Sequence, residues 1–407
     1  MTVERVSVDG AQHRTVPLLT PVSWDGAREH AHAVATPLAP RPLPLADAAG
    51  AVLAAPLVAP CAVPPVDRSA MDGYAVRGPA PWTVVGTVRA GSPLAPPLRR
   101  GQARAIVTGA AVPPGTDAVL PDEDAVRSGK ALTGSVAGGR HIRRAGEESA
   151  AGEELAPAGA VVNPPLLGLA ATLGCDTLLV HPTPRVAACV TGDELVGHGP
   201  PGPGRVRDAI GPMLPGLVER AGGRLLPAVR VPDTRTSLVD ALAAADAEVV
   251  LVSGSSAAGP ADHLRATLAA LHADLLVDGV ACRPGHPQTL AQLPDGRLVV
   301  GLPGNPLAAL VAFLTLAVPV LAGLRGEPLP ALLAAPVPGG LERHASSTRL
   351  VPVRVGPFGT EPVGHGGSAM LRGAATADAL AVVDPGPAAA IAARLLPLDP
   401  GARPWGV

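Results

Sequence analysis

The segment that most restricts the fold of this chain runs from Arg297 to Pro306 and reads RLVVGLPGNP. Its first part, Leu298–Gly301, is a short apolar run typical of strands that are buried on both faces. Two prolines and a Gly-Asn pair then form a turn, and the apolar stretch Leu307–Leu324 predicts a helix. We expect the turn at the carboxyl edge of a sheet, where α/β proteins bind ligands. The same turn chemistry also fits a purely structural connection.

Strand-like and helix-like segments alternate in the region that leads to this turn. The expected strands are Val186–Val190, Arg224–Val229 and Glu248–Val252, and the expected helices are Met213–Ala221, Ser237–Ala245 and Ala261–His272. Such alternation is typical of a parallel sheet with helices on both faces. The Gly/Pro-rich segment 197–204 does not open a helix after a strand, so we interpret it as a flexible loop and not as a dinucleotide-binding fingerprint.

The flanking regions have a different pattern. Trp24–Val34 predicts a helix capped by Ser23, Leu45–Leu57 predicts a short helix before an extended piece, and residues 152–180 have a helical pattern. Short β-rich runs separated by Gly and Pro occur between them and near the C-terminus; they are Trp82–Val88, Ala103–Thr108, Ala118–Leu120, Arg349–Val355 and Leu380–Val383.

The predicted fold class is therefore α/β plus β in several domains. It comprises a parallel-sheet domain with helices on both faces, an inserted small β domain and a C-terminal β domain. The expected parts are a tail (1–20), a helical and linker domain (21–61 plus 146–180), the inserted domain (62–145), the α/β domain (181–327) and the C-terminal domain (328–407).

The composition of the chain narrows the classes of protein to consider. With 407 residues it is too long for one ordinary core, and its net charge of −2 gives no electrostatic basis for binding nucleic acid or an anionic membrane. The 4 cysteines show neither C-x-x-C nor Cys/His pairing, and Met1–Gly10 has no signal-peptide pattern. We expect a cytoplasmic protein with no nucleic-acid or membrane partner.

The apolar stretch Leu307–Leu324 meets the lower length limit for a membrane span, with Thr315 as its only polar residue. Pro319 and Gly323 interrupt it, and no basic residues anchor its start. We favour a helix buried between domains or subunits, with a membrane helix as the alternative.

Several loops combine glycine with a carboxylate or a hydroxyl group. They are Ser69–Tyr74, Thr108–Ala110, Thr191–Glu194 and Ser253–Ser256, the last followed by Asp262. Backbone donors in such loops suit phosphate or another oxyanion, and a nearby carboxylate suits Mg²⁺, although each loop alone also fits an ordinary turn. The rigid turn Arg283–Pro287 (RPGHP) offers two further cations, and with the turn at 303–306 it favours an anion pocket.

Taken in order, these motifs resemble those of the molybdopterin molybdotransferases, the family to which the C-terminal part of gephyrin is related. The motifs are SAMDGYAV at 69–76, TGA at 108–110 followed by P-x-G-x-D-A-V, GEE at 146–148, TGDEL at 191–195 and GLPGNP at 301–306. Arg349, Arg354 and the pair Gly367–Ser368 also stand where the family has comparable residues. The resemblance runs from about Trp24 to the C-terminus.

The resemblance implies an elongated four-part subunit and a homodimer whose active site lies between subunits. It also implies a reaction in which adenylylated molybdopterin and molybdate are the substrates, Mg²⁺ is the cofactor, and AMP is released. By resemblance the catalytic acids are Asp72, Glu194 and Asp262, of which Glu194 and Asp262 are the metal ligands. The residues implied to hold the pterin substrate are Thr108, Gly109, Gly254, Ser255, Ser256, Pro303, Gly304, Asn305 and Pro306. Those implied to face molybdate are Arg283, His286, Arg349 and Ser368.

Several positions depart from the family pattern. Arg-Pro-Gly-His-Pro at 283–287 replaces Lys-Pro-Gly-Lys-Pro, and His286 is only partly charged near neutral pH. Ser255 adds a Cβ where the family has glycine, 208–210 lacks two polar groups, and Glu148 replaces aspartate. These changes are compatible with an alternative function, that of a catalytically attenuated paralogue that binds molybdopterin as a carrier or scaffold. A second alternative is the enzyme that adenylylates molybdopterin, but that function would need only Arg185–Gly326, whereas the flanking domains carry motifs of their own.

Overall fold

The computed structural model describes residues 21–254, 263–364 and 367–401. The chain divides into two compact units, residues 40–180 and residues 1–39 with 181–407, and each is described here by itself. The five domain boundaries expected from the sequence stay predictions.

The unit formed by residues 40–180 consists mainly of short strands. Its strands are β1 (Arg41–Pro44), β2 (Val52–Leu53), β3 (Leu57–Val58), β4 (Arg68–Ser69), β5 (Gly73–Val76), β6 (Trp82–Val88), β7 (Gln102–Ile106), β8 (Ala118–Pro121), β9 (Val126–Ser128), β10 (Ala131–Thr133), β11 (Ile142–Arg143), β12 (Glu154–Ala156) and β13 (Thr177–His181). Six of them form one sheet in the order β8-β5-β7-β6-β10-β9, with apolar clusters on both faces. This sheet is the inserted β domain that the sequence predicted.

Two helix predictions in this unit are confirmed only in part. The segment Leu45–Leu57 contains only a single 3₁₀ turn, η1 (Leu45–Asp47), because Gly50 takes φ 75° and Val52–Leu53 then pairs as a strand. Within 152–180 the only α-helix is α2 (Pro164–Thr172), which starts where the Asn163 side chain accepts a hydrogen bond from the Leu166 N–H. A second 3₁₀ turn is η2 (Asp122–Asp124).

The other unit contains a mixed seven-stranded sheet. Its strands are β14 (Arg185–Thr191), β17 (Arg224–Leu225), β18 (Val229–Val231), β19 (Val249–Ser253), β20 (Asp274–Asp278), β22 (Thr289–Gln292) and β23 (Leu298–Leu302), in the order β17-β14-β19-β23-β22-β20 with β18 beside β14. The strands from β14 to β23 run parallel as predicted, whereas β22 is antiparallel to its neighbours β20 and β23. The strand predicted at 224–229 is split in two around Pro227, which has no N–H to donate.

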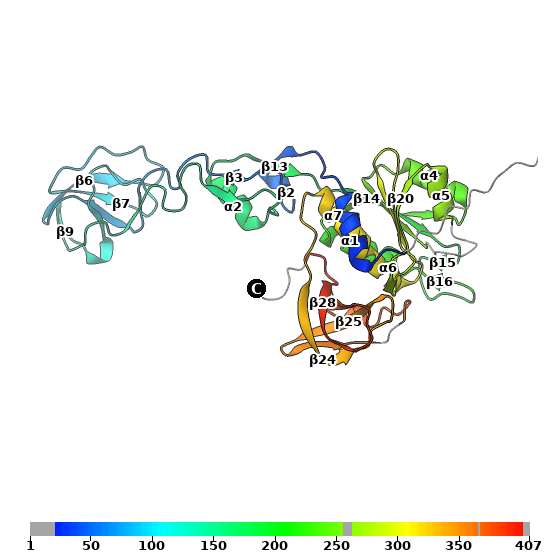
Figure 1. Cartoon of the computed structure of the whole chain (residues 1–407). Coiled ribbons are helices and arrows are strands. Elements are labelled where there is room, and N and C mark those ends of the chain that lie inside the picture. The colour runs from blue at the N-terminus through cyan, green and yellow to red at the C-terminus, as the bar shows by residue number, and fades with distance from the viewer. Residues whose placement is uncertain (1–20, 255–262, 365–366, 402–407) are drawn as a thin grey trace, which may run out of the picture. The chain divides into compact units, whose positions relative to one another are not determined.

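Helices cover both faces of this sheet, as Figure 1 shows. The helices are α1 (Trp24–Ala33), α3 (Leu214–Arg220) after the turn η3 (Gly211–Met213), α4 (Arg235–Ala244), α5 (Leu264–Ala270), α6 (Pro306–Ala312) and α7 (Val318–Leu324), with a π-helical turn η4 (Phe313–Ala317) between the last two. Alternate residues of β19 face opposite cores: Leu251 packs with α1 and α7, and Val250 and Val252 pack with α4 and α5.

The apolar helical stretch is a core element. Pro306–Leu324 has a mean hydropathy of 2.5, and its apolar window is buried completely inside the protein. Its polar residue, Thr315, accepts a hydrogen bond from Trp24 Nε1 at 3.0 Å. A Cβ on Gly323 would lie 2.7 Å from Ala35 Cβ, so the missing side chain allows α7 to approach α1 closely.

The C-terminal part is a curved β domain with its own core. Its strands are β21 (Cys282–Arg283), β24 (Leu333–Leu341), β25 (Thr348–Gly356), β26 (Gly359–Pro362), β27 (Ala379–Val383) and β28 (Ala390–Pro397), with a 3₁₀ turn η5 (Ala374–Thr376). β21 belongs to the loop before β22, and it pairs in parallel with β25. A separate short pair, β15 (Leu195–Val196) with β16 (Val206–Arg207), follows β14.

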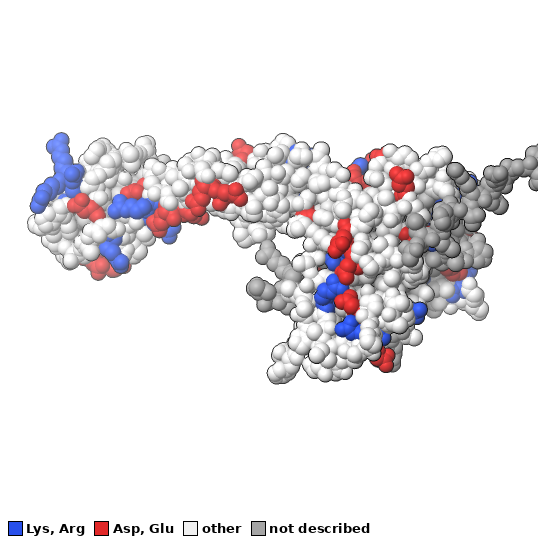
Figure 2. Space-filling model, in the orientation of Figure 1, with Lys and Arg blue, Asp and Glu red and all other residues white. Residues whose placement is uncertain are grey.

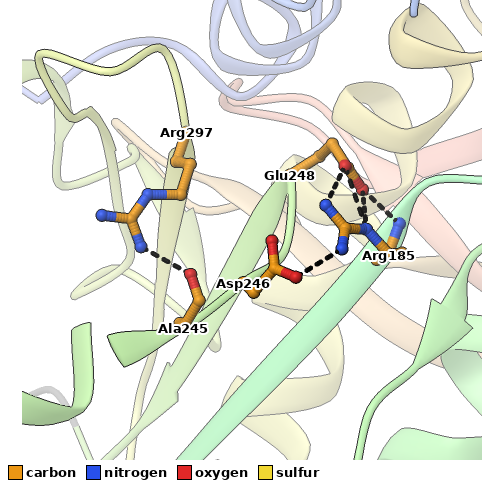
Figure 3. Close-up of polar contacts among 5 residues, drawn as sticks. All are labelled: Arg185, Ala245, Asp246, Glu248 and Arg297. Atoms are coloured by element: carbon orange, nitrogen blue, oxygen red, sulfur yellow. Dashed lines mark hydrogen bonds and ion pairs between the residues drawn. The ribbon is translucent and has the colours of Figure 1, made fainter. Parts of the chain in front are cut away.

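A polar network aligns the amino ends of the three strands that matter most for the site (Figure 3). The Arg185 guanidinium binds the Glu248 carboxylate, with Nη2 2.8 Å from Oε1, and its Nη1 lies 2.8 Å from Asp246 Oδ2. Arg297 donates to the carbonyl of Ala245 at 2.7 Å. These residues begin or immediately precede β14, β19 and β23, so the contacts lie at the amino ends of these strands. On the face drawn in Figure 2, charged residues occur in small groups of both signs.

Candidate active site

The carboxyl ends of β14, β19 and β23 meet at one edge of the sheet. Val190 pairs with Ser253, and Ser253 pairs with Leu302, so the three loops that follow start at the same level. The Thr191 hydroxyl donates to the Ser253 carbonyl at 2.6 Å and ties the first two loops together. The structure therefore brings together the loops that the sequence predicted for ligand binding.

The first cavity at this edge, which we call the edge cavity, has a volume of about 560 Å³. Predicted site residues that line it are Glu194, Gly254, Pro303, Gly304, Asn305 and Pro306, and Thr191, Asp208 and Ser253 line it as well. Gly254 has φ 86°, and a Cβ there would lie 2.4 Å from Thr191 Oγ1. Only glycine fits this position, so backbone rather than side chain faces the cavity here.

Ser253 supplies an unused donor to the edge cavity. Its side chain is 2% exposed, and its hydroxyl has no hydrogen-bond partner among the described residues. A buried hydroxyl without a partner costs free energy, and a ligand oxygen in the cavity would remove that cost.

The carboxylates of the edge cavity fit a magnesium ion only as part of a complex with substrate. Glu194 and Asp208 both line it, and Asp208 Oδ1 already accepts from the Ile210 and Gly211 N–H groups at 3.0 and 2.9 Å. In the part of the chain that the structure describes, no three His, Cys, Asp or Glu residues form a metal-binding group. Mg²⁺ commonly takes one or two carboxylates and fills its other positions with water and substrate phosphates, so this donor set is adequate.

The second cavity, which we call the cationic cavity, has a volume of about 720 Å³ and shares Pro287, Pro303 and Asn305 with the edge cavity. All four residues predicted to face molybdate line it, namely Arg283, His286, Arg349 and Ser368. The parallel pairing of β21 with β25 sets Arg283 directly beside Arg349. Two guanidinium groups and an imidazole around one cavity suit a small oxyanion.

Asn305 connects the two cavities. Its side-chain amide donates to Ser368 Oγ at 3.1 Å, and the Ser368 carbonyl accepts from the Ala308 N–H in the first turn of α6 at 3.1 Å. The loop that carries Ser368 is thereby attached to the turn after β23. The residues shared by the two cavities would therefore contact a ligand in either one.

Cys282 also lines the cationic cavity but is not available as a thiolate. Burial raises the pKa of its thiol to about 12, although a hydrogen bond from the Gln288 amide to its sulfur acts in the opposite direction. The thiol therefore stays protonated at neutral pH and adds no negative charge to a cavity lined by cations.

The unit formed by residues 40–180 holds a separate group of predicted residues. Asp72 precedes β5 and Thr108 follows β7, and the pairing of Gly73 with Ile106 sets the two loops side by side. Asp72 Oδ1 accepts from the Thr108 N–H at 2.6 Å and from its hydroxyl at 2.9 Å, and these bonds, the N–H first, lower the pKa of Asp72. The carboxylate is exposed and ionised, and Gly109 has φ 79° in the same loop.

A third cavity, of about 730 Å³, lies at the amino end of the sheet beside the network of Figure 3. Its charged residues bind one another: Arg185 contacts Asp246 and Glu248, and Arg297 contacts Asp295. The cationic cavity differs, because no Asp or Glu occurs among the described residues that line it. Arg349 lies 3.7 Å from Glu342, which is outside the lining. We therefore place the site at the carboxyl edge.

Three predicted site residues, Ser255, Ser256 and Asp262, lie outside the described residues. Sequence reasoning did not select Asp208, which lines the edge cavity, or His344, which lines the cationic cavity. Asp208 follows the short strand β16 in a segment that lacks a recognisable strand pattern. His344 reaches the cavity only through the packing of the C-terminal domain, which no local pattern encodes.

Comparison with known proteins decides the family. Residues 22–174 match the MoeA N-terminal region (domains I and II), 187–323 a probable molybdopterin binding domain, and 334–390 the MoeA C-terminal region (domain IV). Molybdopterin molybdenumtransferase 2 of Mycobacterium tuberculosis (strain H37Rv) is 36% identical over 328 residues, which are 74% of this chain and 80% of that protein. The chain belongs to the MoeA family of molybdopterin molybdenumtransferases. The resemblance that the motifs indicated is thus confirmed.

Other MoeA-family proteins agree with this assignment. The molybdopterin molybdenumtransferase of Nostoc sp. (strain PCC 7120) is 34% identical over 294 residues, covering 68% of this chain and 67% of that protein. A crystal structure of the molybdopterin biosynthesis MoeA protein of Pyrococcus horikoshii superposes with a TM-score of 0.77 at 25% identity, covering 93% of this chain and 99% of that one. The predicted fold class, α/β with an inserted and a C-terminal β domain, is confirmed for this MoeA-family chain.

Proposed function

We propose that the protein inserts molybdate into adenylylated molybdopterin, with Mg²⁺-dependent release of AMP. One observation carries the proposal most strongly: two adjoining cavities at the carboxyl edge share a wall at Asn305 and differ in chemistry. The edge cavity offers backbone, a buried hydroxyl and carboxylates, which suit phosphates and their metal. The cationic cavity offers Arg283 and Arg349, which suit a tetrahedral dianion. The relatives named molybdopterin molybdenumtransferase support the transfer of molybdenum to molybdopterin.

The residues of the edge cavity would hold the phosphate end of the pterin substrate. The Ser253 hydroxyl would donate to a phosphate oxygen, and the glycine at 254 would let the ligand approach the backbone. Glu194, with Asp208, would hold Mg²⁺, which when bound neutralises phosphate charge and polarises the phosphorus–oxygen bond that breaks. Predicted contributions of Ser255, Ser256 and Asp262 belong to the same proposal.

The residues of the cationic cavity would bind and orient molybdate. Arg283 and Arg349 neutralise the dianion, and Ser368, oriented by its bond from Asn305, offers a hydroxyl group. With the oxyanion held next to the pterin end of the substrate, the two anions would react as oriented neighbours, and the reaction would no longer depend on their diffusing together. Asp72, held as a carboxylate by Thr108, is proposed as a further catalytic carboxylate, and Thr108 and Gly109 as substrate contacts.

The proposal is tested by incubating the protein with adenylylated molybdopterin, molybdate and Mg²⁺ and measuring AMP. We expect AMP release that needs both molybdate and Mg²⁺, and we expect Glu194→Gln and Asp262→Ala to reduce it by about 10²-fold or more. Folded wild-type protein that releases no AMP would refute the proposal. Binding of the pterin substrate without AMP release would instead support the attenuated paralogue, whose basis is the changed loops at 208–210, 253–259 and 283–287.

We further propose a homodimer, which the MoeA resemblance implied, and a cytoplasmic location. Light scattering coupled to size exclusion should give twice the mass of one chain at micromolar concentration. A monomeric mass for protein that is active at the same concentration would contradict the dimer.

A further inference from the structure

The cationic cavity is lined by two histidines, His286 and His344, whose backbone contacts place their protons on opposite ring nitrogens. His286 Nδ1 lies 2.8 Å from the Val280 carbonyl oxygen. A carbonyl oxygen can only accept, so Nδ1 carries the proton in this contact. In the neutral ring Nε2 is then a lone-pair acceptor, and it has no partner among the described residues.

His344 has the reverse arrangement. The Ser346 N–H donates to His344 Nδ1 at 3.2 Å. Nδ1 must therefore be the unprotonated nitrogen, which leaves the proton of the neutral ring on Nε2. His344 can offer an N–H to a ligand without any change of charge, whereas neutral His286 can offer only a lone pair.

An oxyanion discriminates between these two rings, because each of its oxygens accepts hydrogen bonds and repels a lone pair. His286 could present an N–H at Nε2 in two ways. Moving its proton from Nδ1 would turn the 2.8 Å contact with the Val280 carbonyl oxygen into a contact between two lone pairs, at a cost comparable to a lost hydrogen bond, and the carbonyl would keep only its bond from the Cys282 N–H. Adding a proton at Nε2 keeps that bond and also supplies a positive charge.

We propose that an oxyanion enters the cationic cavity together with one proton, which His286 takes up at Nε2, while the neutral ring of His344 donates a further hydrogen bond. The proposal rests on the oxyanion site of the proposed function and adds a new contact residue, His344, and a proton to it. A lysine at position 286 would bring its own charge, so the coupling depends on the histidine of this chain. The step forms one N–H bond on His286 and takes the proton from solvent.

The other groups that face His286 do not supply the same pH dependence. Arg283 and Arg349 also line the cavity, and guanidinium groups are permanent cations in proteins. The Glu342 carboxylate lies 3.7 Å from the Arg349 guanidinium and not against the His286 ring. The Cys282 thiol stays protonated because burial raises its pKa to about 12. His344 is the other histidine among the described residues that line the cavity, and a proton on its Nδ1 would break the bond from Ser346.

The test is calorimetric titration of the full chain with sodium molybdate alone, in buffers of different ionisation enthalpy, between about pH 6.5 and about pH 8.5. At the alkaline end we expect uptake of close to one proton per molybdate bound, and affinity that rises about tenfold for each unit of pH decrease before levelling off. His286→Lys should bind with no proton uptake and an affinity that does not vary with pH. His286→Gln should also be insensitive to pH, but weaker than wild type at the acidic end.

His344→Gln is the matched control. It should weaken molybdate binding at every pH by about threefold to tenfold while keeping the proton uptake of the wild type. Wild-type binding without proton uptake, a slope that persists in His286→Lys, or a slope lost only in His344→Gln would each overturn the proposal. So would the absence of molybdate binding by folded wild-type protein at every pH. Proton-linked molybdate binding without AMP release would leave this inference intact and refute the proposed function.

Discussion

Gly254 is the position at which the geometry of the edge cavity can be tested most sharply. Its φ of 86° lies in the region that side chains disfavour, and a Cβ would lie 2.4 Å from Thr191 Oγ1 and 3.1 Å from the Thr191 carbonyl oxygen. Gly254→Ala therefore forces either the loop after β19 or the Thr191 side chain to move. A move of Thr191 breaks its hydrogen bond to the Ser253 carbonyl.

The size of the effect follows from two contributions. An alanine with positive φ costs about 1–2 kcal/mol, and loss of the Thr191 hydrogen bond costs about 1 kcal/mol. We expect a loss of about 2–3 kcal/mol in the free energy of unfolding of this part of the protein, and a melting temperature lower by about 5–10 °C. Displacement of the loop by about 1 Å should reduce kcat/KM for AMP release by about 10²-fold.

A double-mutant cycle separates the two contributions. Thr191→Ala alone loses the hydrogen bond, and in Gly254→Ala/Thr191→Ala the closest clash is absent while the backbone strain remains. The sum of the stability losses of the two single variants should therefore exceed the loss in the double variant by about 1 kcal/mol. Thr191→Ser keeps the Oγ atom and should not relieve the clash. Strict additivity, or wild-type stability and kcat/KM in Gly254→Ala, would refute this account of the edge.

Three further predictions concern other parts of the molecule. Burial acts to raise the pKa of Glu248, but hydrogen bonds from Arg185 outweigh it and lower the pKa overall. The ion pair therefore stabilises the folded state at pH values above the usual glutamate pKa, and this stabilisation is lost as the pH falls through the lower pKa of the folded state. Glu248→Gln should thus have a lower urea midpoint than wild type at pH 7, and the two midpoints should converge in acid. A gap between the midpoints that grew in acid would contradict the stabilising role of the Glu248 carboxylate. Asp72→Asn should reduce AMP release by about 10²-fold with an unchanged melting temperature, and full activity would exclude a catalytic role. Thr315→Val leaves the buried Trp24 N–H without its acceptor and should lower the free energy of unfolding in denaturant by about 1–3 kcal/mol. The same substitution made in a Trp24→Phe background, which has no N–H to satisfy, should cost less.

Local patterns were sufficient for the elements that carry the site. β19 and β23 are buried along their whole length, and such strands appear in a sequence as continuous apolar runs. The turn at 303–306 was predicted from its prolines, glycine and asparagine, whose backbone preferences are strong. The side chain of Ser23 caps α1 as expected, because it accepts from the Gly26 N–H at 3.1 Å.

Other features depend on pairing between distant segments. β20 and β22 were not predicted, because short strands that pair antiparallel to a neighbour need no characteristic connection. The position of Arg283 beside Arg349 follows from the pairing of β21 with β25, two segments far apart in sequence. The proton positions on His286 and His344 depend on single backbone groups at Val280 and Ser346, and no sequence pattern reports them.

We propose above all that phosphate and molybdate bind in the two cavities that meet at Asn305. The most direct test is a crystal structure of the slow variant Glu194→Gln with adenylylated molybdopterin and molybdate, using anomalous scattering at the molybdenum edge. We predict the substrate phosphates at Ser253 and Gly254 and the molybdenum peak between Arg283 and Arg349. A molybdenum peak outside the cationic cavity, or phosphates in the cavity at the amino end of the sheet, would contradict the account.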